Sequence, residues 1–238
     1  MMYYATREWG AFELGIGFAF EESGAIDNLL LQNMTDPLPE PNADHVSEVV
    51  FDVPLDGLWY VAWGGPDELH NYHVAHPQAA WAFDLVVWKD GGSCAEPCEA
   101  AEDFFAFGQP LRAPAAAEVV AAVDQYPDLI PNVEMDPDHA TGNHVVLKVA
   151  EGEYLLLAHM QSGSVVVAER DQVEAGALLG AVGNSGNTSE PHLHIHLQDR
   201  AQYEHATESM PMEFFAYVND GVPADQGVPI GGTFVRVE

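Results

Sequence analysis

Hydrophobic and polar residues alternate in short runs along most of the chain, and glycine or proline separates many of the runs. Alternation with a period of two is typical of strands with one buried face, and convincing helical periods are scarce. The runs expected to form strands are 46–53, 58–63, 81–88, 117–123, 145–149, 154–158, 165–167, 178–182, 192–197 and 233–237. The pattern therefore predicts an all-β or β-dominated fold, with a sandwich-like antiparallel sheet and few short helices.

The start of the chain has a less regular pattern. The segment 12–20 is apolar but interrupted by glycine, 25–34 could form a short helix, and the proline-rich stretch 36–41 is a rigid break. We expect an N-terminal segment, 1–63, whose strands are added to the main sheet. A central domain, 64–200, and a C-terminal extension, 201–238, that packs on this domain complete the expected organisation.

Two predicted hairpins bring candidate functional residues together. Strands at 71–74 and 81–87, joined by a loop at 77–80, would place His73 directly opposite Asp84. Opposed side chains lie on the same face of a sheet, about 5 Å apart at Cβ, which is close enough for both to bind one metal ion. A slip of one residue would break this register. The second hairpin turns at 150–153 and leaves a strand that ends in His159.

The segment 183–197 carries the strongest chemical signal. A loop rich in glycine and asparagine leads into a strand in which His192, His194 and His196 alternate with three aliphatic residues. A period of two places the histidines on one face and the aliphatic side chains in the core. Adjacent imidazoles disfavour one another's protonation, and neutral imidazole is a common zinc ligand. The strand therefore favours a metal site on its histidine face.

Together these motifs resemble the lysostaphin/LytM-type zinc metallopeptidases. The resemblance rests on the ordered set of upstream histidine and aspartate, strand-ending histidine, and a His-Leu-His that follows Gly-Asn-Ser-Gly-Asn. It implies that His73, Asp84 and His194 hold Zn²⁺, and that His159 and His192 assist the attacking water as proton acceptors or transition-state stabilisers. Two histidines and one carboxylate leave a fourth position open, as in catalytic zinc sites.

The first ligand has two competitors, because the better-known members of this family place their histidine and aspartate only a few residues apart. His70 and His76 are therefore alternatives to His73, although the predicted hairpin register favours His73. We expect His196 to contact the ligands or solvent rather than the metal. The remaining histidines are expected on the surface or in loops: His45, His139, His144 and His205.

The resemblance favours a zinc-dependent endopeptidase that hydrolyses amide bonds in cell-wall-type or short flexible peptides, with a peptide as its partner. The alternative is a zinc-binding, non-enzymatic scaffold or regulator that retains the peptidase fold. Family members with that fate have usually lost a ligand, whereas this chain keeps all five matching residues. The sequence leaves the oligomeric state open.

Composition narrows the choice of partners and location. The chain has 38 acidic and 7 basic residues, a formal net charge of −31, which disfavours nucleic acids and anionic membranes. The first eight residues lack the basic and apolar segments of a secretory signal, so we expect a cytoplasmic location, with secretion as the alternative. Cys94 and Cys98 lie in a loop, where a structural or incidental role is expected.

The excess of carboxylates also predicts a protein adapted to high salt. Self-repulsion at this net charge weakens the compact state, and about 1 M salt shortens the Debye length to about 3 Å. We expect the melting temperature to rise between low and molar potassium chloride in a thermal melt. An unchanged melting temperature would remove this prediction.

Overall fold

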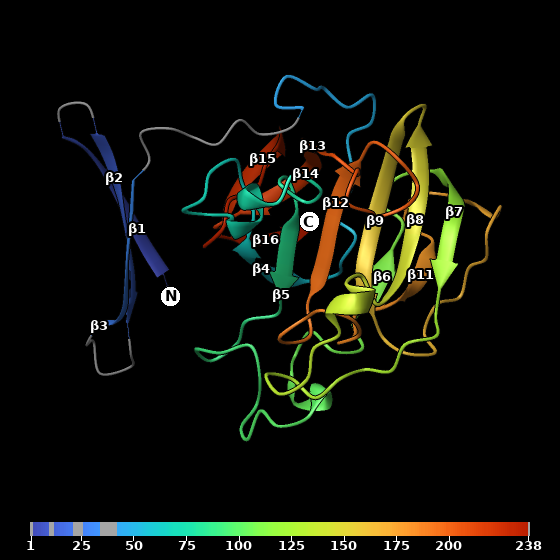
Figure 1. Ribbon diagram of the computed structural model, residues 1–238, viewed down its shortest axis with the longest axis horizontal. Coiled ribbons are helices and arrows are strands. Elements are labelled where there is room, and N and C mark those ends of the chain that lie inside the picture. The colour runs from blue at the N-terminus through green and yellow to red at the C-terminus, as the bar shows by residue number, and fades with distance from the viewer. Residues whose placement is uncertain (1, 10–11, 21–25, 34–41, 238) are drawn as a thin grey trace.

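The computed structural model describes residues 2–9, 12–20, 26–33 and 42–237, with side chains from residue 42 to residue 236 (Figure 1). These residues form sixteen strands and three single-turn 3-10 helices, arranged in sheets of eleven, three and two strands. All strand pairs between named strands are antiparallel, which confirms the predicted β-dominated fold. Within the described ranges, no helix has the length and apolar character needed to cross a bilayer.

The large sheet has the order β10-β7-β8-β9-β12-β5-β4-β16-β14-β15, and β13 pairs with β12. Its strands are β4 (Leu58–Trp63), β5 (Phe83–Val86), β7 (Ala117–Val123), β8 (Asn143–Ala150), β9 (Glu153–Met160), β10 (Gln172–Val173), β12 (Leu193–Gln198), β13 (Ser209–Met210), β14 (Phe214–Asn219), β15 (Val222–Gly227) and β16 (Phe234–Val237). The small sheet pairs β6 (Pro110–Arg112) with β11 (Leu178–Ala181) and lies behind β7 to β9 in the view of Figure 1.

Alternation along the central strands builds one main core. The aliphatic residues of β12 that alternate with the histidines are fully buried, as are alternate residues of β8 and β9. They share a hydrophobic cluster with Leu111 of β6 and Leu179 of β11, so the small sheet covers this face of the large one. The opposite face of β9 contributes Leu156 and Ala158 to a second, smaller cluster. The histidines therefore project from the face that the main core leaves free.

The N-terminal strands pair among themselves, β1 (Met2–Trp9) with β2 (Phe12–Phe20), and β2 with β3 (Ile26–Asn33). The short helix expected at 25–34 was therefore wrong, because the backbone there makes ladder hydrogen bonds with β2 along its length. Figure 1 shows this three-stranded sheet beside the main body. Among the described strands of the segment 1–63, β4 belongs to the large sheet, and β1 to β3 form a separate one. The division of the chain into the regions 1–63, 64–200 and 201–238 stays a prediction.

Two of the short strand predictions also fail. Residues 46–50 form no strand although all are described, and residue 51 makes a single bridge to Phe214. The Ser47 hydroxyl and the backbone N–H of Glu48 instead donate to the buried carboxylate of Glu153, at 2.7 and 3.1 Å. Residues 165–167 are described as irregular chain, and two of their three valines, Val165 and Val167, pack on the main core without strand pairing.

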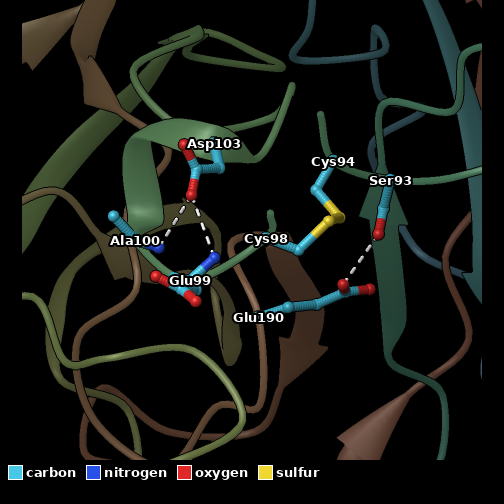
Figure 2. Close-up of a disulfide and its surroundings, with 7 residues drawn as sticks. All are labelled: Ser93, Cys94, Cys98, Glu99, Ala100, Asp103 and Glu190. Atoms are coloured by element: carbon cyan, nitrogen blue, oxygen red, sulfur yellow. Dashed lines mark hydrogen bonds between the residues drawn. A yellow bond between two sulfur atoms is a disulfide. The ribbon is translucent and has the colours of Figure 1, made fainter. Parts of the chain in front are cut away.

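Cys94 and Cys98 form a disulfide that closes a short loop (Figure 2). The Asp103 carboxylate braces this loop by accepting the backbone N–H groups of two neighbouring residues, each at 2.9 Å. Ser93, next to the bridge, donates its hydroxyl to the Glu190 carboxylate at 2.8 Å. The cysteines therefore have a structural role, and their loop is tied to the segment that leads into β12.

Candidate metal centre

The pairing of three strands positions the first two candidate ligands. β12 lies between β5 and β9, and His194 is the partner of Asp84 on one side and of Ala158 on the other. Cross-strand partners share a face of the sheet, so this row aims the imidazole and the carboxylate at the same side. His194 Nδ1 lies 2.9 Å from Asp84 Oδ1, and both side chains are buried.

His73 reaches the same carboxylate by a route that differs from the predicted hairpin. The residues expected to form a strand at 71–74 instead enter the 3-10 helix η1 (Tyr72–Ala75), so the predicted register was wrong. His73 Nε2 nevertheless lies 3.4 Å from Asp84 Oδ2. The structural cause is Asn71, which caps the helix and accepts the backbone N–H of His73 at 3.2 Å. The predicted proximity is correct, but the helix cap produces it rather than strand pairing.

Asn71 is a supporting residue that sequence reasoning missed. It is fully buried, and its side-chain NH₂ group donates to three carbonyl oxygens: those of Gly65, Ala80 and Ala82. Its Oδ1 is therefore the acceptor for His73 Nδ1 at 2.8 Å, so Nδ1 carries the proton. The lone pair of His73 Nε2 is thereby left to face Asp84. The preference of asparagine for helix caps was the signal available in the sequence.

A β-bulge places His159 on the site. The register between β8 and β9 slips here, so that Ala158 and His159 together oppose His144. His159 has a φ of +58°, in the left-handed region that non-glycine residues rarely adopt. Strict alternation would put His159 on the face opposite to Ala158, and the bulge turns it back. Its Nδ1–H donates to the carbonyl of Ser185 at 2.9 Å, which leaves Nε2 free to act.

His192 lies one residue before β12 and faces His159. The two ring centroids are 4.8 Å apart. The Nδ1–H of His192 donates to the carbonyl oxygen of Glu190 at 2.8 Å, and the Thr188 hydroxyl lies 3.1 Å from the same nitrogen. His192 Nε2 is 3.4 Å from Asp84 Oδ1. Both predicted catalytic histidines are thus anchored through Nδ1 and present Nε2 to the same space.

The charge states suit a cation. Burial opposes ionisation of Asp84, but the facing His73 and His192 rings hold the pKa of its carboxyl well below the usual value. Burial lowers the pKa of His73 to about 4 and that of His159 well below its ordinary value. Burial also acts against protonation of His192, yet the Asp84 carboxylate raises its pKa overall. The centre therefore combines an anionic carboxylate with at least two neutral imidazoles.

The donor atoms converge in two groups that share one histidine. The ligand atoms of His73, Asp84 and His194 all lie within 4.8 Å of one another, and so do those of His159, His192 and His194. Nitrogen and carboxylate oxygen are the donors that Zn²⁺ takes in catalytic sites, so these residues fit the ion. The first group contains the three predicted ligands, and the second contains both predicted catalytic histidines.

The other histidines have separate surroundings. The two competitors for the first ligand position lie outside both groups: His70 Nδ1 is 2.8 Å from Asp67, and His76 is exposed on the rim of the site. His144 was expected on the surface or in a loop, but it lies in β8, is mostly buried and donates to the carbonyl of Gly142. His45 contacts the buried carboxylate of Glu153, and His139 contacts Asp136. His205 is exposed.

The centre opens into a groove of about 560 Å³. Aromatic side chains line its walls: Trp63, Tyr72 and Tyr203. Among its described lining residues, Asp84 and Glu190 are acidic, and none is lysine or arginine. A groove of this volume, lined by acidic but not by basic side chains, suits a short peptide whose own side chains are neutral or cationic.

Gly142 supports the centre from behind and gives a testable prediction. Its φ is +54°, and a Cβ added there would overlap the carbonyl of Ser185, the acceptor for His159. Gly152, in the β8–β9 turn, has a φ of +76° and open space around it. We expect Gly152→Ala to lower the free energy of unfolding by about 1–2 kcal/mol through backbone strain alone, and Gly142→Ala to lower it further. Urea denaturation measures both, and equal losses would contradict the predicted overlap.

Comparison with known proteins finds a similarity to peptidases over part of the chain. The model of Peptidase family M23 matches residues 99–206, fewer than half of the 238 residues. The matched segment contains His159, His192 and His194, whereas His73 and Asp84 lie upstream of it. The chain is also 33% identical over 91 residues to the cell division protein DipM of Caulobacter vibrioides, which covers 38% of this chain and 13% of DipM.

Solved structures with a similar arrangement include lysostaphin from Staphylococcus simulans and a zinc-containing peptidase from Vibrio cholerae. Lysostaphin is 15% identical with a TM-score of 0.40, over 68% of this chain and 50% of its own. The Vibrio cholerae peptidase is 12% identical with a TM-score of 0.36, over 78% of this chain and 52% of its own. The chain thus spans about half the length of these two structures and a smaller part of DipM. This chain is therefore similar to Peptidase family M23 over residues 99–206.

Proposed function

We propose that this protein is a zinc-dependent endopeptidase that hydrolyses amide bonds in peptidoglycan-type or short flexible peptides. The observation that carries the proposal is the convergence of His73, Asp84 and His194 beside two further histidines that are not needed as ligands. A structural zinc site has four protein ligands and no need of additional anchored imidazoles. The match of residues 99–206 to the model of Peptidase family M23 supports a hydrolytic reaction.

His73 Nε2, the Asp84 carboxylate and His194 Nδ1 would hold the zinc ion. When bound, zinc polarises the scissile carbonyl and lowers the pKa of the attacking water to about 7. The negative charge of Asp84 offsets part of the charge of the cation. The hydrogen bond from His73 to Asn71 keeps its ring in the orientation that presents Nε2.

His159 and His192 would move the protons and stabilise charge. Each presents Nε2 while its Nδ1–H is fixed by a backbone carbonyl, so neither ring needs to reorient during the reaction. One ring accepts the proton of the water and passes it to the leaving amine. The other, when protonated, donates a hydrogen bond to the oxyanion that develops on the scissile carbonyl.

Metal analysis combined with a cleavage assay tests the proposal. We expect one zinc ion per chain and release of new amino groups from purified peptidoglycan or from a glycine-rich peptide. A chelator should stop the release, and added zinc should restore it. Asp136→Ala, at an exposed carboxylate that bonds His139, is a control that should behave as the unchanged protein. One tightly bound zinc without cleavage of either substrate would favour the non-enzymatic scaffold.

The location of the protein is part of the same proposal. The cytoplasmic location expected from the first residues stays a prediction. The Cys94–Cys98 disulfide supports the alternative of an oxidising compartment, where such bonds persist. A peptidoglycan-type substrate is compatible with that alternative. The absence of nucleic-acid and membrane partners, and the adaptation to salt, also stay predictions.

A further inference from the structure

His196 and Gln198 form a buried chain of hydrogen bonds behind the metal centre. His194 Nε2 lies 3.0 Å from His196 Nδ1, and His196 Nε2 lies 3.0 Å from Gln198 Oε1. Gln198 Nε2 donates to the carbonyl of Arg200 at 2.7 Å. His196 and Gln198 are both fully buried. Neither His196 nor Gln198 lines the groove, so these hydrogen bonds act on the metal centre from behind it.

The direction of every hydrogen bond in this chain follows from its last member. A carbonyl oxygen only accepts, so the nitrogen of the Gln198 amide faces Arg200 and its oxygen faces His196. His196 Nε2 must therefore carry a proton and donate it to Gln198. In the neutral ring, His196 Nδ1 is then an acceptor, and the donor to it is the Nε2–H of His194.

This direction decides which nitrogen His194 offers to the groove. With its proton on Nε2, the neutral ring of His194 has a lone pair on Nδ1, which is 2.9 Å from Asp84 Oδ1. A lone pair that faces a carboxylate oxygen is unfavourable unless a cation lies with them. We propose that His196, oriented by Gln198, is a positioning residue that selects the Nδ1-binding tautomer of His194 and so strengthens metal binding. This inference rests on the zinc site of the proposed function.

Zinc affinity and the tautomer of His194 test the inference without any assay of activity. In Gln198→Leu, His196 loses its acceptor and can turn its own Nδ1–H toward His194. We expect the zinc dissociation constant, measured by competition with a chromophoric chelator, to rise about 10–100-fold, the range typical of lost outer partners. Gln198→Glu keeps an acceptor oxygen and should restore affinity to within about threefold of the unchanged protein.

Ile195→Val is the matched structural control. Ile195 lies between the two histidines on β12 but points into the main core, so its shortening disturbs packing and leaves the hydrogen-bonded chain intact. We expect lower stability but unchanged zinc affinity in this variant. A merely structural role for Gln198 predicts that Gln198→Leu behaves like Ile195→Val, and that result would overturn the inference.

Nitrogen-15 NMR of the zinc-loaded, unsubstituted protein provides a test that needs no variant. We expect His194 to show a protonated Nε2 and a metal-shifted Nδ1, and His196 to show a protonated Nε2. A His194 ring protonated on Nδ1 would overturn the inference. Zinc bound with the expected tautomer in a protein that cleaves no peptide would leave the inference standing and refute the proposed activity.

Discussion

Asp84→Ala should yield a folded protein that has lost its zinc. Asp84 supplies the carboxylate of the proposed ligand set, and it is the only acidic side chain in either group of converging donors among the described residues. Without it, His73 and His194 remain as two imidazoles with no anion to offset the cation. We expect the zinc dissociation constant to rise more than about 100-fold, beyond the effect typical of outer partners. The loss of zinc chemistry should lower kcat/KM about a thousandfold or more.

Asp136→Ala is the matched control for this experiment. Asp136 also bonds a histidine, with its Oδ2 2.8 Å from His139 Nδ1, but this pair is largely exposed and contributes to neither donor group. We expect zinc content and activity to be unchanged in this variant. Metal analysis after gel filtration, together with circular dichroism to verify folding, gives the comparison. A folded Asp84→Ala protein that retains one zinc ion per chain would refute the assigned ligand set.

The histidine strand was predictable because its aliphatic and its histidine residues both recur at every second position. Leu193 and Ile195 had to enter a core, and the alternation then fixed His192 and His194 on the other side. β12 begins one residue later than expected, which does not change these faces. A buried central strand tolerates no slip, because a shift of one residue would exchange the core and the site.

The remaining site residues depend on local backbone features that alternation does not reveal. His159 reaches the centre through a bulge with a positive φ, whereas a regular strand would have turned it away. His73 reaches Asp84 because Asn71 caps a single helical turn and binds three carbonyls from the surrounding loop. In both cases one tertiary hydrogen-bond arrangement overrides the pattern of the segment. Alternation alone would have misplaced His159, whereas the hairpin register gave the correct proximity of His73 to Asp84 from a strand that the structure does not contain.

Failures of the fold prediction have a similar origin. The segment 46–50 has a strand-like composition, but the buried carboxylate of Glu153 takes its polar groups as partners. The segment 26–33 has a composition compatible with a short helix, yet it pairs with β2 along most of its length, with one register shift next to Phe20. Partners outside each segment decided these outcomes, and the composition of the segment itself does not display them.

His192→Ala and His159→Ala should each keep zinc and lose turnover. Both rings are anchored by backbone carbonyls and stand beside the proposed ligands rather than among them. We expect the zinc dissociation constant to stay within about threefold, and kcat to fall about 10²–10⁴-fold, the range for a lost general base or oxyanion donor. Competition with a chelator and steady-state kinetics on one glycine-rich peptide measure the two effects separately. His139→Ala, at an exposed histidine, is the control.

His73→Ala and His192→Ala together decide between the two groups of converging donors. Because His194 belongs to both, its removal cannot distinguish them, whereas His73 and His192 each belong to one. If the ion is held by the group with Asp84, His73→Ala releases zinc and His192→Ala retains it. The reverse result would move the metal to His159, His192 and His194 and leave His73 and Asp84 as their supporting partners. The second group lacks a carboxylate, so a cation there would depend on Asp84 from outside its ligand shell, which makes the first group the better electrostatic site.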